Sequence, residues 1–178
     1  MDMDRDMDDL DGAVVVAVGG NLPGAHDSVQ AGLMAALDRL EAEGLAIVAR
    51  SSWWTSRAWP DPTDPPFVNA AILIRTNLDP ASTLAVLHRV EAAFGRRRSD
   101  FNAPRALDLD LIAHGRTVMG QCGSVGLTLP HPRAHERAFV MGPLAQIAPT
   151  WRHPTLGSTA AHLAKTAPVG ADARPLID

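Results

Sequence analysis

The 178-residue chain lacks the features that mark disulfide-bonded, zinc-binding and membrane-spanning proteins. Cys122 is the only cysteine, which excludes an intrachain disulfide and a cysteine-rich zinc site. No apolar run approaches the ~20 residues of a membrane-spanning helix, and the acidic N-terminus is the opposite of the basic start of a signal peptide. Tyrosine is absent as well. We therefore expect a soluble, cytoplasmic protein with no membrane partner.

Excess charge is confined to one short segment. The formal net charge is −4, but residues 1–12 alone hold six aspartates and Arg5. Such a segment cannot bury apolar surface, so residues 1–12 are expected to form an acidic disordered tail. Residues 13–178 hold 14 acids and 15 bases, and a nearly neutral body argues against a nucleic-acid partner. The length predicts one domain over 13–178, and we expect it to be a monomer.

Hydrophobic periodicity and turn residues predict the order of elements. Strands are expected at 13–18, 47–54, 67–76 and around Asp108. One helix is expected after a cap at Asp27 or Ser28, and a second at 80–94. After these we expect a short strand at 127–131, a partly helical stretch at 133–147 and a helix capped by Ser158. The order strand–helix–strand–strand–helix–strand predicts an α+β fold with a ferredoxin-like βαββαβ core, in which helices pack on an antiparallel sheet. That fold serves many functions, so the function has to come from the site.

The most informative segment is 102–111, which ends in Asp108-Leu-Asp110-Leu. On a strand, Leu107, Leu109 and Leu111 point to one face while Asp108 and Asp110 point to the other. Two neighbouring carboxylates repel each other unless cations lie between them. Mg²⁺ binds carboxylate oxygens and completes its coordination shell with water and substrate phosphates. A bare Asp-x-Asp would be interpreted as a half-exposed edge strand with solvated acids, but Pro104-Arg105 and the arginines just upstream favour a magnesium site that handles phosphates.

Four arginines lie just before this strand. Residues 96–105 contain one acid, Asp100, and four arginines: Arg96, Arg97, Arg98 and Arg105. Arginine makes bidentate contacts with phosphate and stays charged at any working pH. Gly95 ends the preceding helix, so the arginines are expected on a loop of the kind that closes over a reacting phosphate. Such a charge run alone would be read as a solvated surface, but the adjacent carboxylate pair favours a nucleotide triphosphate site.

With these motifs, the chain resembles the 6-hydroxymethyl-7,8-dihydropterin pyrophosphokinase family. The resemblance covers about residues 14–175 and is most specific in Pro104-Arg105-x-x-Asp108-Leu-Asp110-Leu-Ile. Supporting matches are Val18-Gly-Gly-Asn21-Leu, Pro66-Phe-Val-Asn69-Ala, Glu91 with Gly95-Arg96, and Leu127-Thr-Leu-Pro-His131-Pro-Arg133 running on to Phe139 and Pro143-Leu144. The resemblance implies transfer of the β,γ-diphosphate of ATP to the pterin hydroxymethyl group, with release of AMP, in folate biosynthesis.

The same resemblance implies roles for individual residues. Catalysis is assigned to Arg96, Arg105, Asp108 and Asp110, the aspartates holding two Mg²⁺ ions that arrive with ATP. ATP binding is assigned to Glu91, His88, Arg98, His131 and Arg137. Pterin binding is assigned to Phe67 and Phe139 on the ring faces, Asn69 at the ring edge, and Ser56, Trp59 and Asp108. A pterin is flat, apolar on its faces and polar at its rim, so two aromatic rings and an amide suit it.

Several departures and alternatives accompany this assignment. Asn102 and Ala103 stand where many members carry a tryptophan, and His88 stands where a glutamine often helps to bind ATP. By composition alone, Phe67 and Phe139 are better explained as residues that pack in the core. The rival enzyme class is a nucleotidyltransferase, which attacks the α-phosphorus and releases pyrophosphate. The rival binding module is a ferredoxin-like RNA-binding domain, in which an aspartate pair on the sheet would repel the RNA phosphates.

Overall fold

The computed structural model describes residues 10–59, 61–96, 104–120 and 126–177. Its strands are β1 (Val14–Gly20), β2 (Ala46–Arg50), β3 (Trp54–Ser56), β4 (Phe67–Arg75), β5 (Asp108–His114) and β6 (Arg174–Pro175). Its α-helices are α1 (Val29–Ala42), α2 (Pro80–Ala93), α3 (Ala138–Ile147) and α4 (Ala160–Thr166), with short 3-10 helices at Leu10–Gly12 and Ala134–Glu136. Most of the predicted tail, residues 1–9, lies outside the described part of the chain.

The strands form one antiparallel sheet in the order β5-β1-β4-β3-β6, with β2 also paired to β4. Strand β1 lies between β4 and β5, and β4 separates β1 from β2 and β3. Each strand–helix–strand unit therefore skips one position in the sheet, which is the arrangement of a split βαβ unit. The predicted ferredoxin-like α+β fold is confirmed.

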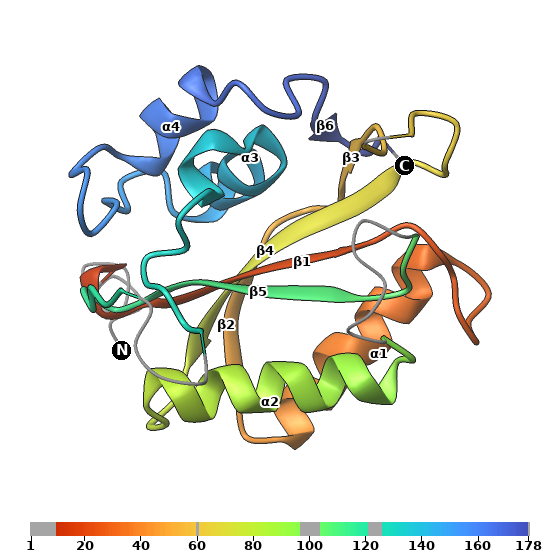
Figure 1. Ribbon diagram of the computed structural model, residues 1–178, viewed down its shortest axis with the longest axis horizontal. Coiled ribbons are helices and arrows are strands. Elements are labelled where there is room, and N and C mark those ends of the chain that lie inside the picture. Colours follow the sequence, from red (N-terminus) through yellow and green to blue (C-terminus); the bar gives the residue numbers. More distant parts are fainter. Residues whose placement is uncertain (1–9, 60, 97–103, 121–125, 178) are drawn as a thin grey trace, which may run out of the picture.

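Helices α1 and α2 cover one face of this sheet and α3 and α4 cover the other (Figure 1). Beneath α1 and α2 lies the larger core, which includes Val16, Val18, Leu109 and Leu111 together with Leu33, Leu40, Leu87 and Val90 of the helices. Both helices begin where the sequence places a cap. The Ser28 hydroxyl accepts the Ala31 amide hydrogen, and the Asp79 carboxylate accepts that of Ser82.

The second face changes character along its length. Under α3 it is apolar, with Val15, Leu73 and Ile112 buried against Met141 and Leu144. Further along β1, Gly19 pairs with Asn69 on one side and Asp108 on the other. Directly opposed residues in a sheet point to the same face, so the polar side chains gather where the apolar packing ends. The alternation of leucine and aspartate in β5 thus serves a core on one side and a polar site on the other.

Three sequence-based predictions of elements are wrong. The single strand predicted over 47–54 is divided into β2 and β3, because the Ser51 hydroxyl, rather than a backbone carbonyl, accepts the Ala71 amide hydrogen between them. The strand predicted at 127–131 is reduced to an isolated bridge between Leu129 and Met119, since Pro130 has no amide hydrogen to continue a ladder. The last helix is capped by Thr159 rather than Ser158.

His153 is buried in the segment between α3 and α4, and hydrogen bonds fix its neutral form. Its Nδ1 accepts the amide hydrogens of Thr155 and Leu156, each at 3.3 Å. The proton of the neutral ring must then be on Nε2, and the rings of Trp151 and His135 pack against His153 in T-shaped contacts. Burial, reinforced by the charges of His135 and Arg116, lowers the pKa of His153 to about 4.

We expect this histidine to weaken the fold in acid. Between pH 6.5 and 4 the unfolded chain protonates this ring while the folded chain does not, so stability falls as pH decreases through that window. His153→Asn keeps an acceptor for the two amides and cannot titrate. Its acid-induced loss of unfolding free energy should be smaller by about 2 kcal/mol, measured by urea unfolding at pH 7 and pH 4. His162→Asn, at an exposed histidine, is the control; a His153→Asn loss equal to that of wild type would contradict the prediction.

Candidate active site

Two carboxylates and three guanidinium groups form the centre of the polar region. Asp108 and Asp110 project from the same face of β5, separated by buried Leu109. Asp108 pairs with Arg96 and, at 3.4 Å, with Arg105. Asp110 pairs with Arg137 at 3.6 Å. All four residues predicted for catalysis are therefore together, and Arg137, predicted for ATP binding, joins them.

The carboxylate pair carries unfavourable charge in the free protein. Burial and the neighbouring charge of Asp108 raise the pKa of Asp110 to about 6. A raised pKa of this origin falls when a cation lies between the two groups. Among the described residues, no group of three or more His, Cys, Asp or Glu side chains is placed to hold a metal. Two oxygen ligands suit Mg²⁺, which takes its remaining ligands from water and phosphate.

Glu91 lies beneath this centre at the end of α2. It is 5% exposed, accepts the Leu109 amide hydrogen at 2.7 Å and pairs with Arg96. Burial raises the pKa of Glu91 to about 7 despite that amide and the charge of Arg96. Glu91 therefore connects α2 to β5 and directs the Arg96 guanidinium toward Asp108. Predicted as an ATP contact, it lies behind the arginine that would contact the phosphates.

Asn21 fixes the segment that carries Arg105, and the sequence analysis missed this role. Its Oδ1 accepts the Arg105 amide hydrogen at 2.8 Å, and the Arg105 carbonyl accepts the amide hydrogens of Asn21 and Leu22. Its Nδ2 donates to the Pro65 carbonyl at 3.0 Å. Asn21 is 2% exposed. The only local signal was an asparagine directly after two glycines at a strand end, which predicts a turn and no partner.

A second polar group lies across β1 from the carboxylates. Asn69 is buried on β4 and donates through Nδ2 to the Ser56 hydroxyl at 2.9 Å. Phe67 pairs with Ser56 in the register of β3 and β4. The row Asp108–Gly19–Asn69 spans two strand spacings, about 10 Å, with no side chain at its centre. A pocket of about 360 Å³ lies in the following loop, lined by Arg57, Ala58, Pro62, Asp64 and Pro66.

Phe139 lies near the start of α3, two residues after Arg137. The Arg137 guanidinium carbon is 5.8 Å from the centre of the Phe139 ring, within the range of a cation–π contact. Arg137 therefore contacts both Asp110 and Phe139. The predicted phosphate side and the predicted pterin side of the site are connected through this one residue.

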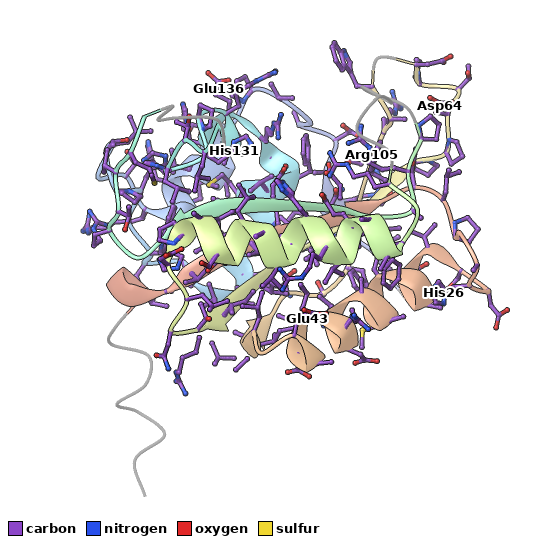
Figure 2. The ribbon with its side chains drawn as sticks, turned by 60° about the horizontal axis from the view of Figure 1, so that its bottom comes forward. His26, Glu43, Asp64, Arg105, His131 and Glu136 are labelled. Atoms are coloured by element: carbon purple, nitrogen blue, oxygen red, sulfur yellow. The ribbon has the colours of Figure 1, made fainter. Side chains whose placement is uncertain are left out.

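The remaining predicted residues are less closely tied to the centre. His131 receives the Arg133 amide hydrogen on Nδ1 at 3.2 Å, and burial beside Arg137 lowers its pKa to about 4, so it is neutral with a hydrogen on Nε2. His88 is half-buried one turn before Glu91 on α2, and Trp59 is 74% exposed on the loop after β3. Figure 2 places Arg105 and His131 on the same side of α2, opposite His26 and Glu43. Arg98 and Asn102 lie outside the described residues.

On this ferredoxin-like sheet, paired carboxylates among arginines form a site suited to a phosphate-transferring enzyme. The chain belongs to the 7,8-dihydro-6-hydroxymethylpterin-pyrophosphokinase (HPPK) family, whose model matches residues 15–149. None of the helices among the described residues is long and apolar enough to cross a membrane.

Two curated bacterial relatives are named 2-amino-4-hydroxy-6-hydroxymethyldihydropteridine pyrophosphokinase. The Synechocystis protein is 40% identical over 145 residues, covering 82% of this chain and 71% of that protein. The Methylorubrum extorquens protein is 41% identical over 118 residues, covering 66% and 73%. A crystal structure of an HPPK-DHPS protein in complex with substrates aligns with a TM-score of 0.67 at 12% identity, over 86% of this chain and 42% of that one. At that identity the structural likeness shows the fold alone, and the chain spans less than half of that longer protein.

Proposed function

We propose that this protein transfers the β,γ-diphosphate of ATP to the hydroxymethyl group of 6-hydroxymethyl-7,8-dihydropterin, giving AMP and the pterin diphosphate. The observation that carries the proposal is the Asp108–Asp110 pair, surrounded by Arg96, Arg105 and Arg137 and separated from Asn69 by a glycine. The proposed phosphate-binding centre is thus separated only by Gly19 of β1 from the Asn69 amide, a group suited to the edge of a heterocycle. The names of the relatives supply the chemical identity of that heterocycle.

Asp108 and Asp110 would hold two Mg²⁺ ions, and the donor set fits, since both groups are oxygens whose mutual repulsion a cation relieves. When bound, these ions neutralise phosphate charge and make the pterin hydroxyl more acidic. Arg96 and Arg105, which pair with Asp108 in the free protein, are then available to the phosphates as negative charge moves to the leaving AMP. No protein nucleophile is required, because the hydroxyl can attack the β-phosphorus directly.

The residues around this centre would bind and orient the two substrates. His131 is neutral and offers an Nε2 hydrogen to ATP, and Arg137 supplies a further charge; Arg98 and His88 are assigned to the same substrate by the family resemblance. Phe67 and Phe139 would contact the pterin faces, with Ser56 and Trp59 at its border. Since Ser56 occupies one Nδ2 hydrogen of Asn69, the amide oxygen of Asn69 remains for the donors on the pterin edge.

The proposal also takes residues 13–178 to be a single pyrophosphokinase domain that acts as a cytoplasmic monomer. The single sheet that joins β1 to β6 supports a single structural unit. Sedimentation of the purified protein with and without Mg·ATP would test the oligomeric state.

Product analysis tests the reaction itself. The protein would be incubated with Mg²⁺, ATP and 6-hydroxymethyl-7,8-dihydropterin, with a control that lacks the pterin. We expect pterin-dependent AMP and an equal amount of diphosphorylated pterin. Release of pyrophosphate with an adenylated pterin would replace the proposal by nucleotidyl transfer, and ADP would replace it by transfer of a single phosphoryl group.

A further inference from the structure

The segment 169–172, between α4 and β6, lies beyond the family match and contacts the start of α3. The Val169 carbonyl accepts the Ala138 amide hydrogen at 2.8 Å, and the Val169 amide donates to the Glu136 carbonyl at 2.9 Å. These two bonds form a parallel bridge between Val169 and Arg137. The backbone on both sides of Arg137, at Glu136 and Ala138, is thereby fixed. Phe139 is the next residue in the chain after Ala138.

Gly170 places its backbone directly against the Phe139 ring. A Cβ atom at Gly170 would lie 2.5 Å from Cδ1 and 3.1 Å from Cε1 of that ring. Contacts under 3.0 Å are not tolerated, so any larger residue at this position displaces the ring. Gly170 also has φ of +71°, a conformation that L-residues rarely adopt. The position of the Phe139 ring therefore depends on the absence of a side chain at residue 170.

Asp172 holds the base of the loop that follows β3. Its Oδ2 accepts the Arg57 amide hydrogen at 2.7 Å. Arg57 comes directly after Ser56, which receives the Asn69 hydrogen bond, and it lines the pocket in this loop. The chain then continues into β6, which pairs with β3, and Leu176 donates to the Trp53 carbonyl at 2.8 Å.

We infer that residues 169–172 form a positioning segment for the heterocycle side of the site, with Gly170 setting the Phe139 ring and Asp172 setting the loop after Ser56. The segment contacts both the start of α3 and the loop after β3, which are far apart in the sequence. Val169 bridges to Arg137, which is assigned to ATP, whereas the contacts of Gly170 and Asp172 reach Phe139 and Arg57. Changes at Gly170 and Asp172 should therefore affect pterin binding more than ATP binding. The inference rests on the proposed function, which assigns Phe139, Ser56 and Asn69 to the pterin.

A matched pair of glycine variants separates ring displacement from backbone strain. Gly170→Ala introduces both, whereas Gly157→Ala introduces only the strain, since Gly157 has φ of +69° with open space around its Cβ direction. We expect Gly170→Ala to raise KM for the pterin about tenfold, the size of one lost aromatic stacking contact, with KM for ATP changed less than about twofold. Gly157→Ala should leave both constants close to wild type. Phe139→Ala is the reference for complete loss of the contact.

A second pair of variants tests the loop and introduces no clash. Asp172→Ala removes the acceptor for the Arg57 amide, and Asp172→Asn restores an acceptor oxygen without the charge. In the ligand-free protein, hydrogen exchange at the Arg57 amide should accelerate in Asp172→Ala and return toward the wild-type rate in Asp172→Asn. The pterin KM should follow the same order, with no corresponding change for ATP.

The inference is overturned if Gly170→Ala and Gly157→Ala have the same pterin KM, if ATP and pterin KM rise together, or if Arg57 exchange is the same in all Asp172 variants. Failure of the proposed function has a different signature: the wild-type protein would then form no AMP that depends on the pterin. The exchange measurement needs no substrate, so the positioning of the loop is judged in either case.

Discussion

Asp110→Ala should reduce pyrophosphoryl transfer by about 10³-fold or more, because a lost metal ligand removes several kcal/mol of transition-state stabilisation. The fold should be unaffected. Asp110 carries a raised pKa beside Asp108 in the free protein, so its charge at neutral pH opposes folding and its removal relieves that opposition. The melting temperature without Mg²⁺ should therefore equal or exceed that of wild type.

Two measurements check this prediction together. Initial rates of pterin-dependent AMP formation give the loss of turnover, and thermal unfolding with and without Mg·ATP gives the loss of ligand-induced stabilisation. Asp38→Ala, at an exposed acid on α1, is the control for removing a negative charge. Near-normal turnover in a folded Asp110→Ala protein would refute the assignment of this carboxylate to the metal.

Gly20→Ala should damage both stability and activity. A Cβ at Gly20 would lie 2.4 Å from the Ala106 carbonyl oxygen and 3.4 Å from that of Arg105. Both atoms are backbone, so the 105–106 segment must move. That movement strains the hydrogen bonds by which Asn21 holds Arg105. We expect a loss of about 2 kcal/mol in unfolding free energy, as for overpacked cores, and a rate about 10²-fold lower, as for a misplaced catalytic group.

Urea unfolding and steady-state rates measure these two effects. Gly120→Ala is a suitable control, since a Cβ there meets nothing within 4 Å and the residue has no positive φ. If Gly20→Ala retained wild-type stability and rate, the close approach of β1 to the 105–106 segment could not be what positions Arg105.

Elements defined by local periodicity were predictable from the sequence. The alternation of β5, the apolar run of β1 and the capped starts of α1 and α2 depend on residues within one element. The division of β2 from β3 was not predictable, because it depends on the Ser51 hydroxyl meeting Ala71 twenty residues later. Sequence periodicity does not predict which distant backbone group a side chain will hydrogen-bond.

The same distinction applies to the site. The grouping of Asp108, Asp110, Arg96 and Arg105 was predictable because carboxylate spacing and arginine density are visible in the sequence. The positioning roles of Asn21 and Gly170 were missed. They come from contacts with residues far away in the chain, Asn21 with Arg105 and Gly170 with Phe139. Arg137 was predicted for ATP alone, and its contact with the Phe139 ring follows from the turn into α3.

The central position of β1 has a consequence for how this protein assembles. Val16 pairs with Ile72 on one side and Leu111 on the other, so the apolar run of β1 is paired on both sides only after both later strands are available. Folding that depends on such distant pairings is slow, and an unpaired β-branched run is prone to intermolecular association meanwhile. Once formed, the amides of this strand open only with the whole sheet. Their exchange rates should therefore report the global unfolding free energy, and the yield of folded protein should improve when synthesis is slowed or protein concentration is kept low.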